Sequence, residues 1–397
     1  MSWLQRWRES TVKRPGRRLV GWLRELVYAA IGMLTTVVVR LVSGSRPVSS
    51  SAAPTRIILV RPDRIGDLVL ALPAFQALRE HFPSAWMTAV VTPRTAPLLA
   101  AHPAVDACVC VQGDRVMDLW HSRAALRQLR QMHAELAIGF QPSWACGLAT
   151  YLTRAKQRVG WDARGAGGFF TRRLPYRSAR VKTHEIDANL QLVAGLGCAA
   201  SSRIPRLAAT PSARQWVDRW WKEQHWPTTG VWVMMHPGSR SAYTRWPPER
   251  FAQLVDRLQG LADTHVALLE GPGESLLIAR VQSQLRVPPA RVVRGLALPE
   301  LMALLERMRL FIGNATGTTH LAAYLGPRVI EIIGGTHPLD CPERWGVLGA
   351  QHRIVRPKAD DIPASAMNAW VGPEGLARIS VEDVWAAVHD VMPARPA

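Results

Sequence analysis

The sequence predicts an α/β protein made of two doubly wound domains with a cleft between them. Short apolar runs alternate with amphipathic segments along most of the 397 residues, which is typical of parallel strands covered by helices. The alternation comes in two series, separated by a Trp-rich stretch near residues 205–230. The chain is also longer than one ordinary core requires, which favours two domains of about 150 residues with additional segments.

The first series predicts a Rossmann-like N-terminal domain over residues 54–210. Its opening strand, residues 56–61, is an apolar run between two arginines, as expected for a strand covered on both faces. Further strands are expected at 86–92, 107–111 and 135–140, and helices at 68–82 and 122–132. This order of strands and helices predicts a parallel sheet.

The second series predicts a C-terminal domain of the same kind over residues 228–378. Strands are expected at 231–235, 265–270, 291–293, 310–313 and 328–333. Helices are expected at 248–261, 274–285, 299–307 and 318–324. Residues 379–397 are predicted to form a last amphipathic helix, over 380–391, and a tail.

Residues 1–53 differ from the rest and predict a segment that associates with a membrane. Seven Lys and Arg and three Trp lie in the first 25 residues, and residues 26–39 carry no charge. A helix of 14 residues covers roughly 21 Å, which is less than the ~30 Å hydrocarbon core, so insertion in the membrane plane is favoured over spanning. The alternative is a helix packed on the protein's own surface. A cleaved signal peptide fits poorly with so long a basic region, and residues 43–54 predict a Ser/Pro-rich linker.

The charge balance favours anionic partners. The chain has 49 Lys and Arg against 30 Asp and Glu, a net charge of +19, which attracts nucleic acid, anionic lipid or phosphorylated substrates. A nucleic-acid binder is the less favoured class because the body lacks the interleaved aromatic and basic residues of a single-strand platform. The five cysteines are scattered without a C-x-x-C pair, so neither a zinc site nor a disulfide framework is expected.

Candidate functional residues follow the predicted strands, because ligands of doubly wound sheets bind beyond the carboxyl ends of the strands. After the first strand come Asp63, Arg64, Gly66 and Asp67. Asp67 is either a general base aimed into the cleft or an N-cap of the following helix. Asp63 is a second candidate acid or an ordinary turn residue.

Three loops of the second domain have the small and hydroxyl-bearing residues that cradle phosphates. Ser239, Arg240, Thr244 and Arg245 follow the strand at 231–235. Gly273 and Glu274 follow the next strand, where the carboxylate is placed either to grip ribose hydroxyls or to begin a helix. The third loop, after the strand at 310–313, contains Thr316, Gly317, Thr318 and His320. We expect the three loops to converge on one donor site.

The motifs in these loops resemble glycosyltransferase family 9, the lipopolysaccharide core heptosyltransferases. The resemblance covers about residues 54–390 and rests on the strings R-P-D-R-I-G-D-L-V-L-A-L-P, H-P-G-S followed by R-W-P-P-E-R-F, G-N-A-T-G-T-T-H and T-H-E-I-D-A-N-L-Q-L-V. It implies a GT-B fold with the acceptor mainly on the first domain and the nucleotide-sugar on the second. It also implies an inverting transfer of heptose from ADP-heptose to a glycolipid acceptor, at the cytoplasmic face of the inner membrane.

The resemblance assigns roles to several positions. Asp67 falls on the family's general base, and Glu274 falls on a nucleoside contact. Thr244 stands where the family usually has lysine, for which Arg245 or Arg240 would substitute, and Ala315 replaces an aspartate. These two departures leave open a catalytically silent relative that binds nucleotide-sugar or glycolipid as a scaffold. No cofactor is expected, and no metal, because no D-x-D-like acidic pair stands in a donor loop.

Overall fold

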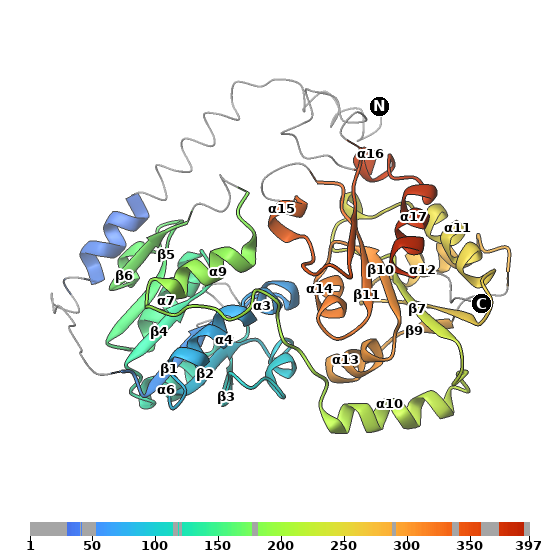
Figure 1. Ribbon diagram of the computed structural model, residues 1–397. Coiled ribbons are helices and arrows are strands. Elements are labelled where there is room, and N and C mark those ends of the chain that lie inside the picture. The colour runs from blue at the N-terminus through green and yellow to red at the C-terminus, as the bar shows by residue number, and fades with distance from the viewer. Residues whose placement is uncertain are drawn as a thin grey trace, which may run out of the picture.

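Two α/β domains, each built on a six-stranded parallel sheet, make up the body of the protein (Figure 1). The computed structural model describes residues 30–39, 41, 53–113, 118, 121–176, 182–287, 291–335, 341–358 and 373–392. The prediction of two doubly wound parallel sheets is confirmed.

The first sheet has the strand order β3-β2-β1-β4-β5-β6. The central strand β1 is buried along residues 57–60, as its apolar run predicts. The strands are β1 Arg56–Val60, β2 Trp86–Val91, β3 Ala107–Cys110, β4 Leu136–Gly139, β5 Gln157–Asp162 and β6 Arg172–Pro175. The helices are α3 Ile65–Val69, α4 Leu72–His81, α6 Arg123–Gln131, α7 Trp144–Leu152 and α9 Glu185–Ala194, with 3₁₀ turns η1 Ala96–Leu99 and η2 Gly167–Phe169.

The second sheet repeats this order as β9-β8-β7-β10-β11-β12. Its strands are β7 Val231–His236, β8 Thr264–Leu269, β9 Arg291–Val293, β10 Leu310–Asn314, β11 Arg328–Ile332 and β12 Arg353–Val355. Its helices are α10 Pro211–Glu223, α11 Pro248–Gln259, α12 Ser275–Gln282, α13 Leu298–Glu306, α14 Gly317–Ala323, α15 Pro342–Trp345, α16 Pro373–Leu376 and α17 Val381–Val391, with the 3₁₀ turn η3 Ala242–Thr244.

Each sheet has a point where the strand order reverses. In the first sheet β1 lies beside β4, and in the second β7 lies beside β10. The loops that leave these neighbouring strands diverge, so a crevice forms between them at the carboxyl edge. The loops after β1, β7 and β10, which contain the candidate residues from the sequence, therefore all begin at one of these two reversal points.

The helix expected over residues 68–82 is two helices. Helix α3 ends at Val69 and α4 begins at Leu72, because Pro73 lacks the N–H that would continue the hydrogen-bond ladder to Val69. Helix α3 also begins earlier than expected, with Arg64 as its N-cap residue. Asp67 thus lies inside the first turn and makes no cap hydrogen bond, so the N-cap interpretation of Asp67 is wrong.

Strands β5, β6 and β12 and helix α7 were not expected from the sequence. Strand β6 has the sequence RRLP and is largely exposed, since it lies at the edge of the first sheet. Edge positions tolerate charge and proline, so such a strand carries no apolar signal. Strand β5 is likewise polar at both ends and buried only in its middle.

The chain crosses between the domains just before α10. Helix α9 packs on α4 of the first domain, whereas α10 packs on α13 of the second. Thr210 caps α10 by accepting a hydrogen bond from the Ala213 N–H, with proline following as the first helical residue. The final helix, α17, packs against β11 and β12, so it is an integral part of the second domain.

A helix over residues 30–39 lies beside the first domain, near β6 in Figure 1. None of the helices in the described ranges is both long and apolar enough to cross a membrane. The basic segment 1–25 and most of the predicted linker lie outside the described residues.

Candidate active site between the two domains

The two domains meet where α3 faces α14 (Figure 1). Gly66 of α3 and Gly317 of α14 form this contact. There is no room for a side chain on Gly317, because a Cβ built there would lie 2.9 Å from the Gly66 nitrogen. A Cβ on Gly66 would lie 3.1 Å from both Gly317 Cα and His320 Cδ2. Gly66 and Gly317 therefore allow a backbone approach that no larger residue permits, and they bring the two reversal points together.

We expect Gly317→Ala to hold the domains apart and to lower the rate of any reaction that uses groups of both domains by about 10²-fold, since a displacement of about 1 Å is enough for that loss. Gly317 does not adopt a positive φ, so the added methyl group acts through the close approach alone. Small-angle scattering of the ligand-free protein measures the spacing. Gly195→Ala is the matched control because its Cβ would meet no atom closer than 3.5 Å. Unchanged scattering and turnover in Gly317→Ala would contradict this role for the contact.

Arg61 lies at the centre of a buried ionic cluster directly after β1. Its side chain is 1% exposed, and its Nε lies 3.1 Å from Asp63 Oδ1. Its Nη2 lies 3.5 Å from Asp67 Oδ1 and 3.6 Å from Glu185 Oε1, and its Nη1 donates to the Phe140 carbonyl at 2.8 Å. A fully buried guanidinium requires anionic partners, and here three carboxylates share one cation.

The second domain adds a further arginine to this cluster. Arg344 Nη2 lies 3.3 Å from Glu185 Oε2 and donates to the Tyr176 hydroxyl at 2.6 Å. The Glu185 carboxylate is thus shared by one arginine from each domain. Beside it, His184 Nε2 donates to the Gly346 carbonyl at 2.8 Å, which is a second polar link between the domains.

Asp67 is the carboxylate of the cluster that is open to an incoming group. Its side chain is 21% exposed, whereas that of Asp63 is 6% exposed and that of Glu185 is 4% exposed. Burial raises the pKa of Asp67, although the neighbouring Arg61 opposes the shift. A carboxylate with a raised pKa is a better proton acceptor, so the geometry favours Asp67 over Asp63 as a general base. Arg64 is exposed at the start of α3 and Gly66 is buried against α14.

The loop after β7 is bonded mainly to itself. The Ser239 and Thr244 hydroxyls lie 2.6 Å apart, and Thr244 donates to the Ser241 carbonyl at 3.0 Å. Two nitrogens of Arg245 donate to the Ser239 carbonyl, at 2.9 Å and 2.6 Å. Arg240 is exposed and forms no ion pair within the described residues. Of the two arginines expected to substitute for lysine, Arg245 therefore shapes the loop and Arg240 is the one accessible to an anion.

Asn314 and Glu274 join this loop to its neighbours. The Asn314 amide donates to the Pro237 carbonyl at 2.8 Å, and its oxygen accepts from the Trp246 N–H at 2.8 Å. Glu274 Oε2 accepts from His236 Nε2 at 3.0 Å and from the Gly271 N–H at 2.9 Å. Burial alone would raise the pKa of Glu274, but the hydrogen bonds that its carboxylate accepts from His236 and from the Gly271 N–H lower the pKa overall. The ionised Glu274 carboxylate thus links the end of β7 to the loop after β8 through hydrogen bonds.

The loop after β10 and the start of α14 place Thr316, Gly317, Thr318 and His320 at the domain junction. Thr316 caps α14 by accepting from the Thr319 N–H, and Gly317 and Thr318 follow it, half-buried. His320 is buried against Gly66, and burial lowers its pKa to about 3, so it is neutral at physiological pH. Gly273 is exposed with φ +77°, so it serves the turn before α12.

Residues 122–367, more than half of the chain, match the sequence profile of glycosyltransferase family 9 (heptosyltransferase). The chain belongs to this family. A curated relative, lipopolysaccharide heptosyltransferase 3 of Escherichia coli, is 21% identical over 285 residues, which cover 68% of this chain and 81% of the relative. This family 9 glycosyltransferase is therefore a heptosyltransferase-like enzyme.

Solved structures agree with the GT-B fold of the enzyme. The E. coli ADP-heptose lipopolysaccharide heptosyltransferase II is similar with a TM-score of 0.70 and 16% identity, over 85% of this chain and 98% of that one. The E. coli heptosyltransferase WaaC with ADP is similar with a TM-score of 0.61 and 17% identity, over 84% and 97%. The two six-stranded sheets of the family 9 enzyme thus form the two Rossmann-like halves of that fold.

Three charged residues of this site received no role from the sequence. They are Arg61, Glu185 and Arg344. A usable signal existed for Arg61, because an arginine that ends an apolar strand at the sheet centre is buried and requires acids. Glu185 and Arg344 had no such signal.

In the described ranges, no three His, Cys, Asp or Glu side chains are grouped so that they could hold a metal ion. Metal independence stays a prediction.

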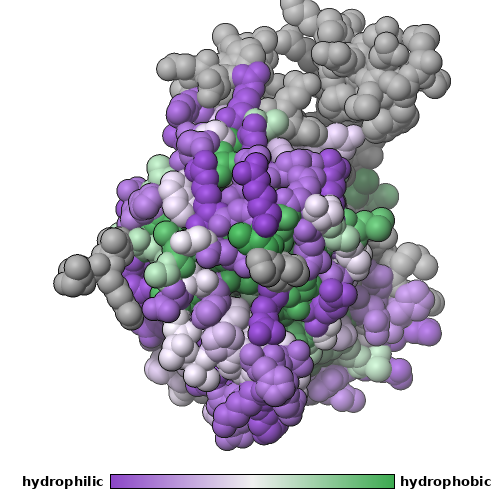
Figure 2. Space-filling model, turned by 90° about the vertical axis from the view of Figure 1, so that its right-hand side faces the viewer, coloured by the Kyte–Doolittle hydropathy of each residue, from purple (hydrophilic) through white to green (hydrophobic). Residues whose placement is uncertain are grey.

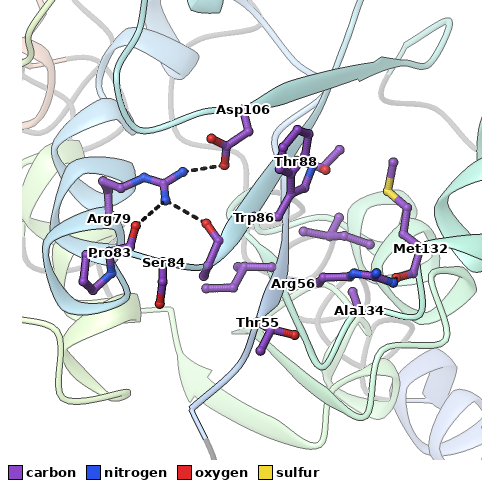
Figure 3. Close-up of a pocket in the computed structure, with 13 residues that line it drawn as sticks. Thr55, Arg56, Arg79, Pro83, Ser84, Trp86, Thr88, Asp106, Met132 and Ala134 are labelled. Atoms are coloured by element: carbon purple, nitrogen blue, oxygen red, sulfur yellow. Dashed lines mark hydrogen bonds and ion pairs between the residues drawn. The ribbon is translucent and has the colours of Figure 1, made fainter.

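A cavity of about 680 Å³ lies elsewhere in the first domain, at the amino ends of β1 and β2 (Figure 3). The side chains of the two arginines that line it already donate hydrogen bonds to other groups of the protein. Arg79 donates to Asp106 at 2.5 Å and to the Ala85 carbonyl at 2.7 Å, and Arg56 donates to the Met132 carbonyl at 2.8 Å. The cavity is at the opposite edge of the sheet from Asp67, so it is not the candidate active site of the glycosyltransferase.

Proposed function

We propose that this glycosyltransferase moves a heptosyl group from ADP-heptose to a lipopolysaccharide core or related glycolipid acceptor, with inversion at the anomeric carbon. The observation that carries the proposal is the partly open Asp67 carboxylate at the junction of the two domains. It follows β1 at the reversal point of the first sheet and lies next to Gly66, which contacts Gly317 of α14. The relative named for lipopolysaccharide heptose transfer and the neighbour solved with ADP support the donor and acceptor classes.

In this mechanism the donor diphosphate lies along the loops after β7 and β10. Asp67 accepts the proton of an acceptor hydroxyl while the oxygen attacks the anomeric carbon. The bond from that carbon to the diphosphate oxygen breaks, and ADP leaves with the electron pair. Arg61 holds Asp67 in position, and Arg240 is an exposed cation within the loop after β7, along which the diphosphate is proposed to lie. The single displacement inverts the configuration.

The experiment is a donor screen by release of nucleoside diphosphate, with and without chelator, using purified protein and extracted core glycolipid. We expect turnover with ADP-heptose, an inverted linkage and no effect of the chelator. Thr244 and Ala315 favour a second candidate, a relative that binds nucleotide-sugar without transferring it. Donor binding by calorimetry without turnover for any donor would select that candidate.

The acid limb of the pH–rate profile is expected above the ordinary aspartate range of about pH 4. Burial raises the pKa of Asp67, and its protonated form cannot accept a proton, so kcat/KM falls as pH decreases through that raised pKa. The measurement is kcat/KM as a function of pH, with stability followed in parallel by circular dichroism. An acid limb at or below the ordinary range would argue that another group is the base.

A further inference from the structure

The helix over residues 30–39 is docked on the first domain by a face of small residues. A Cβ built on Gly168 would lie 2.7 Å from the Thr36 nitrogen, and one on Gly32 would lie 3.4 Å from Gly165 Cα. Thr35 is buried and accepts a hydrogen bond from Trp144 Nε1 at 3.2 Å. This side of the helix therefore has a fixed partner within the chain.

The opposite side of the same helix is apolar and exposed. Six of the nine large hydrophobic side chains exposed in the described part of the chain belong to this segment: Ile31, Met33, Leu34, Val37, Val38 and Leu41, with Leu41 81% exposed. An ordinary surface helix turns polar residues outward. The outer face of the second domain has that ordinary character, since it is mostly hydrophilic in Figure 2. We call residues 31, 33, 34, 37, 38 and 41 the apolar row.

The apolar row lies on the same edge of the first domain as Asp67. Trp144, which bonds to Thr35, begins α7 directly after the carboxyl end of β4. Gly168, which contacts Thr36, lies in η2 after the carboxyl end of β5. Asp67 follows the carboxyl end of β1, the neighbour of β4. A surface that covers the apolar row therefore borders the open edge of the acceptor domain.

We propose that the apolar row lies in the plane of an anionic lipid surface and positions the active site beside a membrane-embedded acceptor. The described helix covers about 15 Å, which is half of a hydrocarbon core, and one of its faces is held by the protein, so it lies along the membrane. The chain that precedes it supplies charge complementarity, because residues 1–25 hold seven Lys and Arg against two Glu, with three Trp. Only the identity of the acceptor rests on the proposed function.

The test is sedimentation of the full chain with vesicles of equal parts phosphatidylcholine and phosphatidylglycerol, without donor or acceptor. The variant Leu34→Asp/Val38→Asp places two charges four residues apart on the apolar row. We expect its partition onto these vesicles to fall by about tenfold or more. The charge-matched control, Ile204→Asp/Leu276→Asp, changes two exposed apolar side chains far from the row in sequence, and it is expected to bind as the unchanged protein does.

Three outcomes would overturn the proposal. The first is that the unchanged protein does not bind the vesicles. The second is that the row variant binds them as strongly as the unchanged protein does. The third is that light scattering shows a dimer of the unchanged protein, which the row variant abolishes while its vesicle binding persists. The last outcome would assign the row to a second copy of the chain. Turnover on a deacylated, water-soluble acceptor is expected to remain in the row variant, with loss confined to acceptor embedded in vesicles. Absence of turnover on both acceptors in the unchanged protein, with vesicle binding intact, would refute the proposed function alone.

Discussion

Asp67→Asn is expected to lower turnover by about 10²–10⁴-fold, the range typical for removal of a general base. Asparagine keeps the size of the side chain and can still accept a hydrogen bond from Arg61, but it cannot take the proton of a sugar hydroxyl. Asp67 makes no cap hydrogen bond in α3, so the substitution removes no helix cap. The measurement is the steady-state rate of nucleoside diphosphate release at saturating donor and acceptor.

The comparison for this prediction is Asp63→Asn, which changes the less accessible acid of the same cluster. Donor affinity by calorimetry and the unfolding midpoint are expected to stay close to those of the unchanged protein in Asp67→Asn. Near-normal turnover in Asp67→Asn, together with a large loss in Asp63→Asn, would move the base to Asp63. Near-normal turnover in both variants would leave the transfer without a base in this cluster.

Arg61→Leu is expected to destabilise the protein by about 3–5 kcal/mol, as measured by urea unfolding at neutral pH. Leucine leaves the carboxylates of Asp63, Asp67 and Glu185 without the cation that they surround. Arg61 opposes the effect of burial on Asp67, so without Arg61 the folded-state pKa of Asp67 rises further above its unfolded value. Protonation of Asp67 then relieves the repulsion, so the loss of stability is expected to shrink as pH is lowered and to be largest above that raised pKa.

The matched control for Arg61→Leu is Arg203→Leu. Arg203 forms an ion pair with Asp187 through two hydrogen bonds, at 2.7 Å and 2.6 Å, but its side chain is 53% exposed. Removal of such a pair is expected to cost no more than about 1 kcal/mol. Equal losses in the two variants would mean that burial of the Arg61 cluster adds nothing to its contribution to stability.

The strands at the centre of each sheet could be predicted from the sequence because they are buried on both faces. The central strands β7 and β10 differ from expectation by a single residue at their ends. Their apolar runs end in loops with small and polar residues, and those loops contain the candidate residues. Asp67 could be singled out because an acid after a central strand lies at the carboxyl edge.

The remaining features depend on contacts between distant parts of the chain. The arginines of β6 are tolerated because no strand in the described ranges pairs with its outer edge, and no local sequence pattern reveals that. Arg61 meets Glu185 only after α9 returns to pack on α4, and Arg344 joins them only when the domains face each other. Such a cluster forms only when the two folded domains pack together, so no periodic pattern in the sequence predicts it.

The burial of the Arg344–Glu185 pair has a consequence for the response of the enzyme to ionic strength. Both side chains are less than a tenth exposed, so mobile ions barely reach the pair and screen it far less than an exposed one. Attraction between the basic N-terminal sequence and anionic lipid, by contrast, acts through solvent and weakens as salt is added. Moderate salt is therefore expected to release the enzyme from vesicles while its two domains stay together.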